Sequence, residues 1–321
     1  MNTHALIPIP RLSIIIPCYN EQHVLPDSLN KLSIFLLELI NKKQIQADSF
    51  LYCVDDGSQD DTWQIILDRH GADPHIKGLR LGRNAGHQNA LLAGLTALKD
   101  QVDCVVTIDA DLQDDINAIK QMLDHFKQGC DIVYGIRQSR EKDTFFKRVT
   151  ALAFYKLMKR SGSDIVFNHA DFRLLSRRTL EQLNQFQERN IFLRGIVTLI
   201  GFKTSTVYYD RADRLFGETK YTLRKMIKLA WDGMISFSHV PLDFILISGI
   251  VSFVLSVGLA GFVIFAKIFC HTIPGWASIM VPLCFIGGIQ LLSIGIIGEY
   301  LAKIYLEVKR RPRYIKDTEL L

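Results

Sequence analysis

The stretch Val105-Val106-Thr107-Ile108-Asp109-Ala110-Asp111 carries two carboxylates at the end of an apolar run. Side chains at positions i and i+2 of an extended segment point to the same face, so Asp109 and Asp111 should lie together where a buried strand meets solvent. Adjacent like charges are costly unless a cation lies beside them, and oxygen ligands of this kind suit Mg²⁺ or Mn²⁺. The stretch therefore predicts a metal-diphosphate site, against the simpler interpretation of a solvated acidic turn.

Strand-like and helix-like runs alternate on both sides of this stretch. The predicted strands are 12–17, 50–54, 76–81, 102–108 and 131–135, and the predicted helices are 21–40, 60–69, 84–98 and 115–127. Ser58 and Asp61 have the spacing of a capping box for the second helix. The alternation is typical of an α/β fold with a Rossmann-like, mostly parallel sheet and helices on both faces. Ligands of such sheets bind at the carboxyl ends of the strands, where polar loops follow three of these runs.

Other motifs exclude several classes of protein. No G-x-G-x-x-G follows the first strand and no G-x-x-x-x-G-K-[ST] is present, which disfavours a dinucleotide dehydrogenase and a P-loop NTPase. The six cysteines form no C-x-x-C pair, so they indicate buried thiols in a reducing compartment and no zinc site. The net charge of +5 is a mild basic excess, and nothing predicts a nucleic-acid partner.

The composition changes after Pro241. Residues 244–265 and 279–297 contain no charged side chain, which gives uncharged runs of 22 and 19 residues. A helix rises 1.5 Å per residue, so each run is long enough to cross a hydrocarbon core of roughly 30 Å. Two such runs in tandem favour a C-terminal transmembrane hairpin within 242–304 over two buried helices of a soluble protein.

The flanking charges predict the orientation of this hairpin. Basic residues cluster before the first run and after the second, at Arg224, Lys225, Lys228, Lys303, Lys309, Arg310, Arg311 and Arg313. The positive-inside rule then places both termini in the cytosol, in a multi-pass protein of the inner membrane. Residues 1–10 do not have the pattern of a signal peptide. The mixed basic and apolar segments 143–161 and 221–241 predict interfacial amphipathic helices, with ordinary packing against the sheet as the alternative.

Three motifs, one of which contains Asp109 and Asp111, resemble a known family in their order and spacing. The segments are 13–21 (SIIIPCYNE), 54–58 (VDDGS) and 109–114 (DADLQD). They resemble glycosyltransferase family two, the inverting enzymes of the GT-A fold. A second set of motifs is 168–174 (NHADFRL), 217–221 (GETKY), 297–300 (IGEY) and 311–314 (RPRY). This set is similar to the polyisoprenyl-phosphate glycosyltransferases, which include dolichol-phosphate mannose synthase and the bacterial undecaprenyl-phosphate glucosyltransferases of the GtrB type.

The resemblance implies a domain plan and a set of site residues. The plan is a cytosolic catalytic domain at 1–220, an interfacial helix at 221–241, two transmembrane helices at 242–304 and a basic cytosolic tail at 305–321.

The residues that would hold the nucleoside are Pro17, Tyr19, Glu21 and Asp56, with Asp55 beside them. Asp109 would close the nucleotide pocket, Asp111 would ligate Mg²⁺ or Mn²⁺ together with it, and Gln113 would support the metal-diphosphate group. The groups implied for the transfer itself are Asp171 at the presumed base position, Arg137 and Arg173 facing the lipid phosphate, and Lys220 on the diphosphate. Many relatives carry Gly where this chain has Ala170, which weakens inference about the sugar.

The implied reaction is inverting transfer of one sugar from a nucleotide sugar to undecaprenyl phosphate at the cytosolic face. UDP-glucose is the favoured donor, while UDP-N-acetylhexosamine, GDP-mannose and an aminoarabinose-type donor stay open. A phosphate monoester has its second pKa near about 6 and is mostly dianionic at neutral pH, so a strong general base is not obligatory. A flippase and a downstream glycosyltransferase are the expected pathway partners, and a homo-oligomer stays open.

Two alternative functions belong to other classes of protein. A processive polysaccharide synthase would normally carry Q-x-x-R-W and more membrane spans, whereas the nearest segment, 190–195 (NIFLRG), has no Trp after its Arg. A non-catalytic lipid-binding or flippase-associated protein predicts loss of the acidic edge, and here the acidic loops are intact.

Overall fold

The computed structural model describes residues 9–137, 169–186, 188, 193–210, 240–269 and 275–321. The chain divides into two compact units. One unit contains the sheet, the short helices and the C-terminal residues 311–321, and the other contains the two long C-terminal helices. The predicted interfacial helix 143–161, residues 221–239 of the second one, and Lys220 lie outside the described residues.

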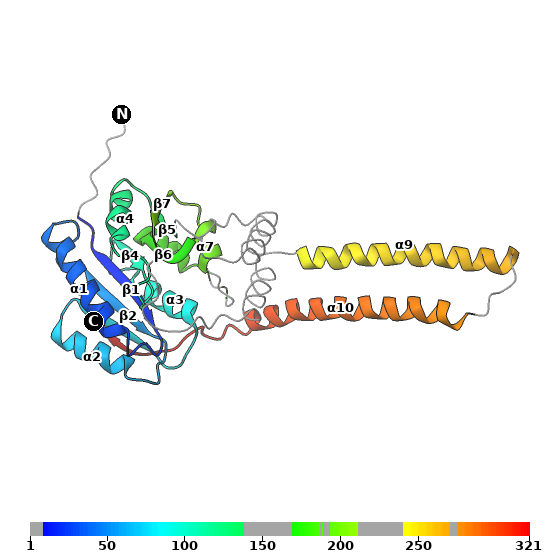
Figure 1. Ribbon diagram of the computed structural model, residues 1–321, viewed down its shortest axis with the longest axis horizontal. Coiled ribbons are helices and arrows are strands. Elements are labelled where there is room, and N and C mark those ends of the chain that lie inside the picture. The colour runs from blue at the N-terminus through cyan, green and yellow to red at the C-terminus, as the bar shows by residue number, and fades with distance from the viewer. Residues whose placement is uncertain (1–8, 138–168, 187, 189–192, 211–239, 270–274) are drawn as a thin grey trace, which may run out of the picture. The chain divides into compact units, whose positions relative to one another are not determined.

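The first unit is built on one eight-stranded sheet with the order β7-β5-β6-β4-β1-β2-β3-β8 (Figure 1). The strands are β1 (Leu12–Cys18), β2 (Phe50–Asp55), β3 (Ile76–Leu81), β4 (Cys104–Thr107), β5 (Ile132–Arg137), β6 (His169–Ser176), β7 (Thr204–Tyr209) and β8 (Lys316–Leu320). β1 pairs in parallel with β2 and β4, β2 with β3, and β5 with β7, whereas β6 and β8 are antiparallel to their neighbours. The predicted α/β fold with a mostly parallel sheet is confirmed.

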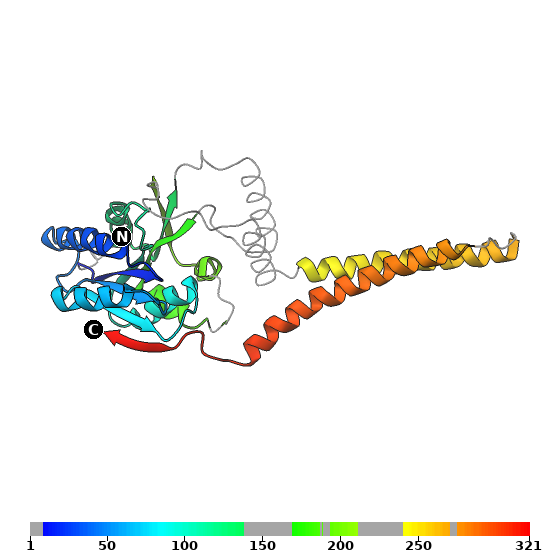
Figure 2. The same ribbon diagram turned by 60° about the horizontal axis from the view of Figure 1, so that its bottom comes forward.

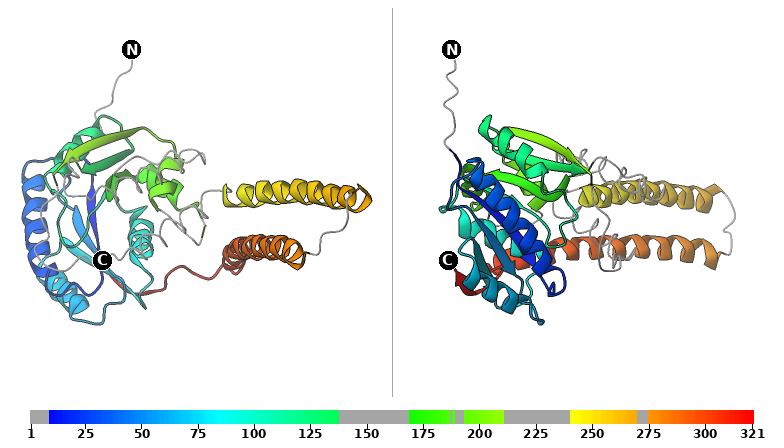
Figure 3. Two further views of the ribbon diagram at one scale, coloured as in Figure 1. Left: turned by 45° about the vertical axis from the view of Figure 1, so that its right-hand side comes forward. Right: turned by 60° about the vertical axis from the view of Figure 1, so that its left-hand side comes forward.

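Helices cover both faces of this sheet. They are α1 (Leu25–Asn41), α2 (Thr62–Ala72), α3 (His87–Leu98), α4 (Ala118–Lys127), α6 (Arg177–Leu183) and α7 (Leu193–Leu199). Alternate β1 residues such as Ile14 join the core formed with α1, α2 and α4. Ile15 points to the other face, where a Cβ on Gly94 of α3 would lie 3.1 Å from it. Figures 1 and 3 show α3 on the opposite side of the sheet from α1 and α2.

Each of the first four helices begins two to four residues later than its pattern predicts, at Leu25, Thr62, His87 and Ala118. The intervening residues form loops at the carboxyl ends of the strands. These loops carry the polar motifs, so the chain there is shaped by polar contacts rather than by helical periodicity.

The sequence pattern did not predict β6. This strand lies next to β4, and it therefore changes the sheet beside the predicted site. It runs antiparallel between β4 and β5, and Figure 2 shows it with its neighbours from another side. Arg173 of β6 is opposite Thr107 of β4 on one side and Tyr134 of β5 on the other. This pairing brings Asp171, two residues earlier, beside the end of β4. The loop 109–114, called the Asp109 loop below, begins there.

The second unit holds α9 (Val240–Phe269) and α10 (Trp276–Val308). Among the residues that the structure describes, one helical segment, Phe285–Val308, is long and apolar enough to cross a membrane. The predicted run 244–265 lies within α9. That α9 also crosses the membrane, as the hairpin requires, stays a prediction.

The end of the chain contains more structure than the predicted basic tail at 305–321. α10 continues to Val308, and Lys316–Leu320 forms β8 against β3. The Gly82 N–H donates to the Ile315 carbonyl at 2.9 Å, and the Tyr52 hydroxyl donates to Glu319 Oε1 at 2.7 Å. The segment after α10 therefore completes the eight-stranded sheet and covers the edge of β3.

Candidate active site

The loops after β1 and β2 are fastened to each other by side chains. The Asn20 N–H donates to Ser58 Oγ at 3.0 Å, and Asn20 Oδ1 accepts from the Gln59 N–H at 2.9 Å. Asn20 adopts a left-handed backbone with φ of 55°, a conformation that Asn tolerates better than most residues. The predicted capping box is wrong, because α2 has no side-chain cap and Ser58 joins the two loops instead.

The first group of predicted nucleoside residues lies at the carboxyl end of β1. Pro17 is paired with Val54 of β2, and the Tyr19 side chain that follows is exposed. The Glu21 N–H donates to Thr62 Oγ1 at 2.8 Å, and its carbonyl accepts from the first N–H groups of α1. These contacts hold Tyr19 and Glu21 at the same edge of the sheet as Asp55, as the sequence predicted.

The two carboxylates at the carboxyl end of β2 are buried and differ in their partners. Asp55 Oδ1 accepts from the Ser58 N–H at 3.2 Å, while Oδ2 accepts no hydrogen bond from the described residues and lies 3.6 Å from Arg80 Nε. Asp56 accepts from the Ala85 and Gly86 N–H groups at 2.7 and 2.9 Å. Burial raises the pKa of both carboxyls. Asp56 thus fixes the loop that leads into α3, and its contact with a nucleoside stays a prediction.

The Asp109 loop follows β4 and is tightly wound. Leu112 has a φ of 44°, which is uncommon for a residue with a side chain and is often found at functional loops. The Gln113 N–H lies 3.5 Å from Asp111 Oδ1, and the Gln113 and Asp114 side chains are buried. Burial raises the pKa of Asp109, and the charges of Asp171, Asp114 and Asp111 add to this effect. The loop therefore concentrates negative charge.

This loop fits a divalent metal that shares its coordination with a substrate. No group of three or more His, Cys, Asp or Glu side chains forms a metal cage within the described part of the chain. Mg²⁺ is commonly held by one or two carboxylates plus substrate phosphates and water, not by a full protein cage. Asp109 and Asp111 would supply that donor set, and a cation there would reduce the repulsion that adds to the effect of burial on the pKa of Asp109.

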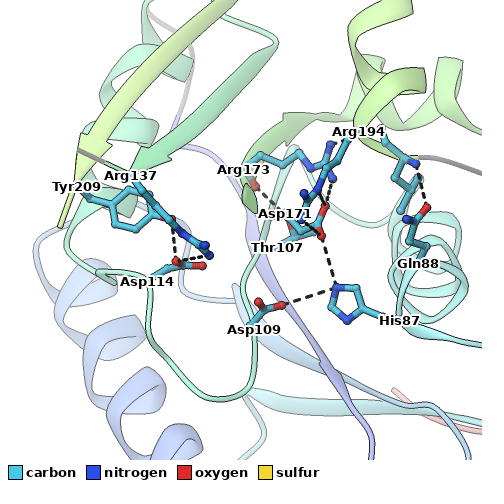
Figure 4. A network of polar contacts seen from close by, with 11 residues as sticks. His87, Gln88, Thr107, Asp109, Asp114, Arg137, Asp171, Arg173, Arg194 and Tyr209 are labelled. Atoms are coloured by element: carbon cyan, nitrogen blue, oxygen red, sulfur yellow. Dashed lines mark hydrogen bonds and ion pairs between the residues drawn. The ribbon is translucent and has the colours of Figure 1, made fainter. Parts of the chain in front are cut away.

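Arg137, predicted to face the lipid phosphate, is engaged at the carboxyl end of β5. Its Nη2 donates to Asp114 Oδ1 at 3.2 Å, and its Nε donates to the Tyr209 hydroxyl at 3.3 Å. The Tyr209 hydroxyl in turn donates to Asp114 Oδ1 at 2.7 Å. Burial raises the pKa of Tyr209, and the neighbouring Asp114 charge adds to it. The triad ties the Asp109 loop to β5 and β7, as the left part of Figure 4 shows.

Asp171 is the centre of a second polar cluster (Figure 4). Its Oδ1 accepts from Arg173 Nη2 at 2.7 Å and from Arg194 Nε at 3.1 Å, and its Oδ2 accepts from Arg194 Nη2 at 3.0 Å. His87 Nε2 lies 3.7 Å from both Asp171 Oδ2 and Asp109 Oδ1. Burial alone would raise the pKa of Asp171, but His87 and the two guanidinium groups hold it well below its usual range. Asp171 is therefore ionised and already hydrogen-bonded through both oxygens.

The structure thus brings predicted residues of the strand ends to one edge of the sheet and adds partners to which the sequence assigned no role, Asp114 among them. His87, Arg194 and Tyr209 complete the two clusters. Arg194 lies in the segment 190–195, which resembles Q-x-x-R-W at the Arg but lacks the Trp, so the sequence does contain a signal for this residue. His87 and Tyr209 belong to no motif that indicated their partners.

A mostly parallel α/β sheet whose central strand ends in an Asp-x-Asp loop is the arrangement of the GT-A glycosyltransferases. Residues 13–183 match the family described as Glycosyl transferase family 2. The chain belongs to this family and is a glycosyltransferase.

Relatives match almost the whole chain. The uncharacterized glycosyltransferase YkoT of Bacillus subtilis (strain 168) is 49% identical over 97% of this chain and 92% of its own length. The prophage bactoprenol glucosyl transferase homolog of Escherichia coli (strain K12) is 36% identical over 95% of this chain and 98% of its own length. Among solved structures, glucosyl-3-phosphoglycerate synthase from Mycobacterium tuberculosis has a TM-score of 0.47 and 15% identity, over 71% of this chain and 79% of that one.

Proposed function

We propose that the chain transfers a single glucose from UDP-glucose to undecaprenyl phosphate, with inversion at the anomeric carbon. The products are a polyprenyl-phosphate glucose and UDP. The observation that carries the proposal is the juxtaposition of the acidic Asp109 loop with Asp171 and its two arginines. Relatives named bactoprenol glucosyl transferase, 36% identical over nearly the full chain, support the acceptor and the sugar.

The transfer forms one bond and breaks one. An oxygen of the acceptor phosphate bonds to the anomeric carbon, and the bond from that carbon to the diphosphate breaks with its electron pair on the diphosphate oxygen. Because the phosphate is mostly dianionic at neutral pH, little proton removal is required. Asp171, ionised and bonded through both oxygens to guanidinium groups, is suited to orienting the acceptor side of the site rather than to acting as a strong base.

The donor side would be held by the loops after β1, β2 and β4. Tyr19, Glu21 and Asp55 are proposed to line the nucleoside pocket, together with Pro17 and Asp56. Asp109 and Asp111 would hold Mg²⁺ or Mn²⁺, which stabilises the negative charge that grows on the leaving diphosphate. Gln113 would support this group, and Lys220, which lies outside the described residues, is proposed to reach the diphosphate.

The membrane arrangement follows from the acceptor, whose polyprenyl chain is insoluble in water. α9 and α10 are proposed to span the inner membrane as a hairpin, with the catalytic unit and both termini in the cytosol. The candidate span Phe285–Val308 and the basic residues after it support this orientation. A flippase and a downstream glycosyltransferase would then use the product, and self-association of the chain stays part of the proposal.

A donor panel tests the proposal. The purified full chain is given undecaprenyl phosphate with radiolabelled UDP-glucose, UDP-N-acetylhexosamine or GDP-mannose, and label in the lipid fraction is measured. UDP-glucose should give the fastest transfer. Faster transfer from another donor would change the sugar but keep the reaction, whereas no lipid label from any donor would contradict the proposed reaction.

A further inference from the structure

His87, the first residue of α3, lies between the two carboxylates to which the proposed function gives different substrates. Its Nε2 is 3.7 Å from Asp109 Oδ1 and 3.7 Å from Asp171 Oδ2. Figure 4 shows the imidazole with one carboxylate on either side of this nitrogen. The proposed function assigns the metal-diphosphate group to Asp109 and the acceptor side to Asp171. His87 therefore borders the space between the two phosphates.

The second nitrogen of the imidazole remains available for a substrate. The His87 side chain is 47% exposed, and among the residues that the structure describes, no hydrogen bond or ion pair involves its Nδ1. A hydroxyl group can donate or accept, so it can pair with Nδ1 whether or not that nitrogen carries a proton. A phosphate oxygen only accepts, so it can pair with Nδ1 only when the nitrogen is protonated. The ring is therefore suited best to a hydroxyl group.

We propose that His87 contacts the sugar being transferred, through a hydrogen bond between Nδ1 and one of the sugar hydroxyl groups. The inference rests on the proposed function and adds a sugar contact to it. In a displacement with inversion, the acceptor oxygen approaches the anomeric carbon from the side opposite the leaving diphosphate. The sugar then lies between the diphosphate and the acceptor phosphate, which is the space that His87 borders.

The first turn of α3 holds His87 in place from both sides. The preceding Gly86 N–H donates to Asp56 Oδ2 at 2.9 Å, which joins the turn to a predicted nucleoside residue. The following Gln88 accepts through Oε1 from the Leu193 N–H of α7 at 3.2 Å. The imidazole is thus carried by a backbone that is bonded to elements on the donor side and on the acceptor side, as a contact with one particular hydroxyl requires.

The test measures binding without an acceptor, so it does not depend on turnover. Affinities of UDP-glucose and of UDP, each with Mn²⁺, are measured on the full chain in detergent. His87→Ala should weaken UDP-glucose about 5-fold or more, the size expected for one hydrogen bond, and UDP less than about 2-fold. The matched control is His125→Ala in α4, where Nδ1 lies 3.2 Å from Ser205 Oγ, and it should change neither affinity by more than about 2-fold. Equal losses of UDP and UDP-glucose affinity in His87→Ala would assign the residue to the diphosphate and overturn the inference.

Two amide variants distinguish a sugar contact from support of the carboxylates. The amide nitrogen of Asn is separated from Cβ by the same number of bonds as Nδ1, and that of Gln by the same number as Nε2. His87→Asn should therefore retain UDP-glucose affinity better than His87→Gln. Equal or better affinity of His87→Gln would mean that His87 acts only through Asp109 and Asp171, and it would overturn the inference while leaving the proposed function intact.

Deoxygenated donors identify the hydroxyl group. Analogues of UDP-glucose that each lack one sugar hydroxyl are bound to the unmodified chain and to His87→Ala. For one analogue the substitution should no longer weaken binding, because the partner of Nδ1 is already absent. An effect of His87→Ala that is the same for every analogue would overturn the inference.

The choice of sugar is tested separately from the role of His87. If the donor panel selects another nucleotide sugar, the same comparison uses that donor and its own nucleoside diphosphate. Preferential loss of that donor in His87→Ala would then support the inference although glucose is wrong. A chain that binds no nucleotide sugar would contradict the inference and the proposed function together.

Discussion

The carboxyl groups in the two halves of the site have pKa values shifted in opposite directions. At the ends of β2 and β4, burial raises the pKa values of Asp55, Asp56 and Asp109. At β6, the Asp171 side chain is 14% exposed, and His87, Arg194 and Arg173 hold its pKa well below the usual range. The first half has more negative charge than its neighbours balance, and the second contains its own cations. We infer that the first half requires a metal with the donor, while the second is ready for an anionic acceptor.

The largest expected effect comes from the first half. Asp111→Asn should lower the rate of sugar transfer by about 100-fold or more, because a bound divalent metal contributes several kcal/mol to such reactions. Asp115→Asn is the matched control, since Asp115 is exposed and accepts from the Asn117 N–H at 2.9 Å. Rates are measured with added Mg²⁺ or Mn²⁺ and with excess chelator. Full activity of the unmodified chain in chelator would contradict the metal requirement.

The second half should show a pH-dependent contribution to stability. Because the folded-state pKa of Asp171 is depressed, its ionisation stabilises the fold above the ordinary Asp range, and this contribution disappears as pH falls through the folded pKa. Asp171→Asn leaves two arginines without their carboxylate and should cost about 3 kcal/mol at neutral pH. Melting temperatures of the full chain in detergent should differ most at neutral pH and converge in acid. A gap that widens towards acid pH would show that Asp171 does not have a depressed pKa.

Gly57 tests whether the first half depends on an exact loop. It has a φ of +69°, and an added Cβ would lie 2.6 Å from the Arg83 carbonyl carbon. Gly57→Ala should destabilise the protein by about 2 kcal/mol and weaken UDP binding, since the loop after Arg83 holds Asp56. Gly71→Ala in α2 is the control, because nothing lies within 4 Å of its added Cβ. Unchanged UDP affinity in Gly57→Ala would show that the donor site does not depend on the conformation of this loop.

Arg137 of β5 lies on the side of β6 away from β4, where it bonds Asp114, and its substitution should give the smallest effect. We predict that Arg137→Ala raises the KM for the lipid phosphate several-fold, and more than the KM for the nucleotide sugar. Tyr209→Phe is the comparison, because it removes the hydroxyl that links Arg137 and Asp114 but keeps the guanidinium. If Tyr209→Phe reproduces the whole effect, Arg137 acts by holding the Asp109 loop and not by contacting the acceptor.

The same contrast explains which features were predictable from the sequence. The first half is made by short strands followed at once by their acidic loops, so hydrophobic runs and adjacent motifs indicate both the fold and the site. The second half depends on pairing between distant segments. β6 enters between β4 and β5, and Arg194 meets Asp171 across 23 residues.

The end of the chain gives a stronger example. Tyr52 and Glu319 are 267 positions apart, and their hydrogen bond joins β2 to a strand that local pattern indicated only as a basic tail. His87 is similar, since an imidazole at the start of a helix becomes informative only when Asp109 and Asp171 lie on either side of it. Local hydrophobic periodicity cannot predict contacts between distant residues that the sheet topology brings together.

The most direct test follows radiolabelled glucose from UDP-glucose on the purified full chain, offered undecaprenyl phosphate or undecaprenol in the presence of Mn²⁺. We predict label in the lipid only with undecaprenyl phosphate, one UDP released per glucose transferred, and an anomeric configuration opposite to that of the donor. UDP release without lipid labelling, or equal labelling of undecaprenol, would contradict the account that the second half of the site receives a phosphate.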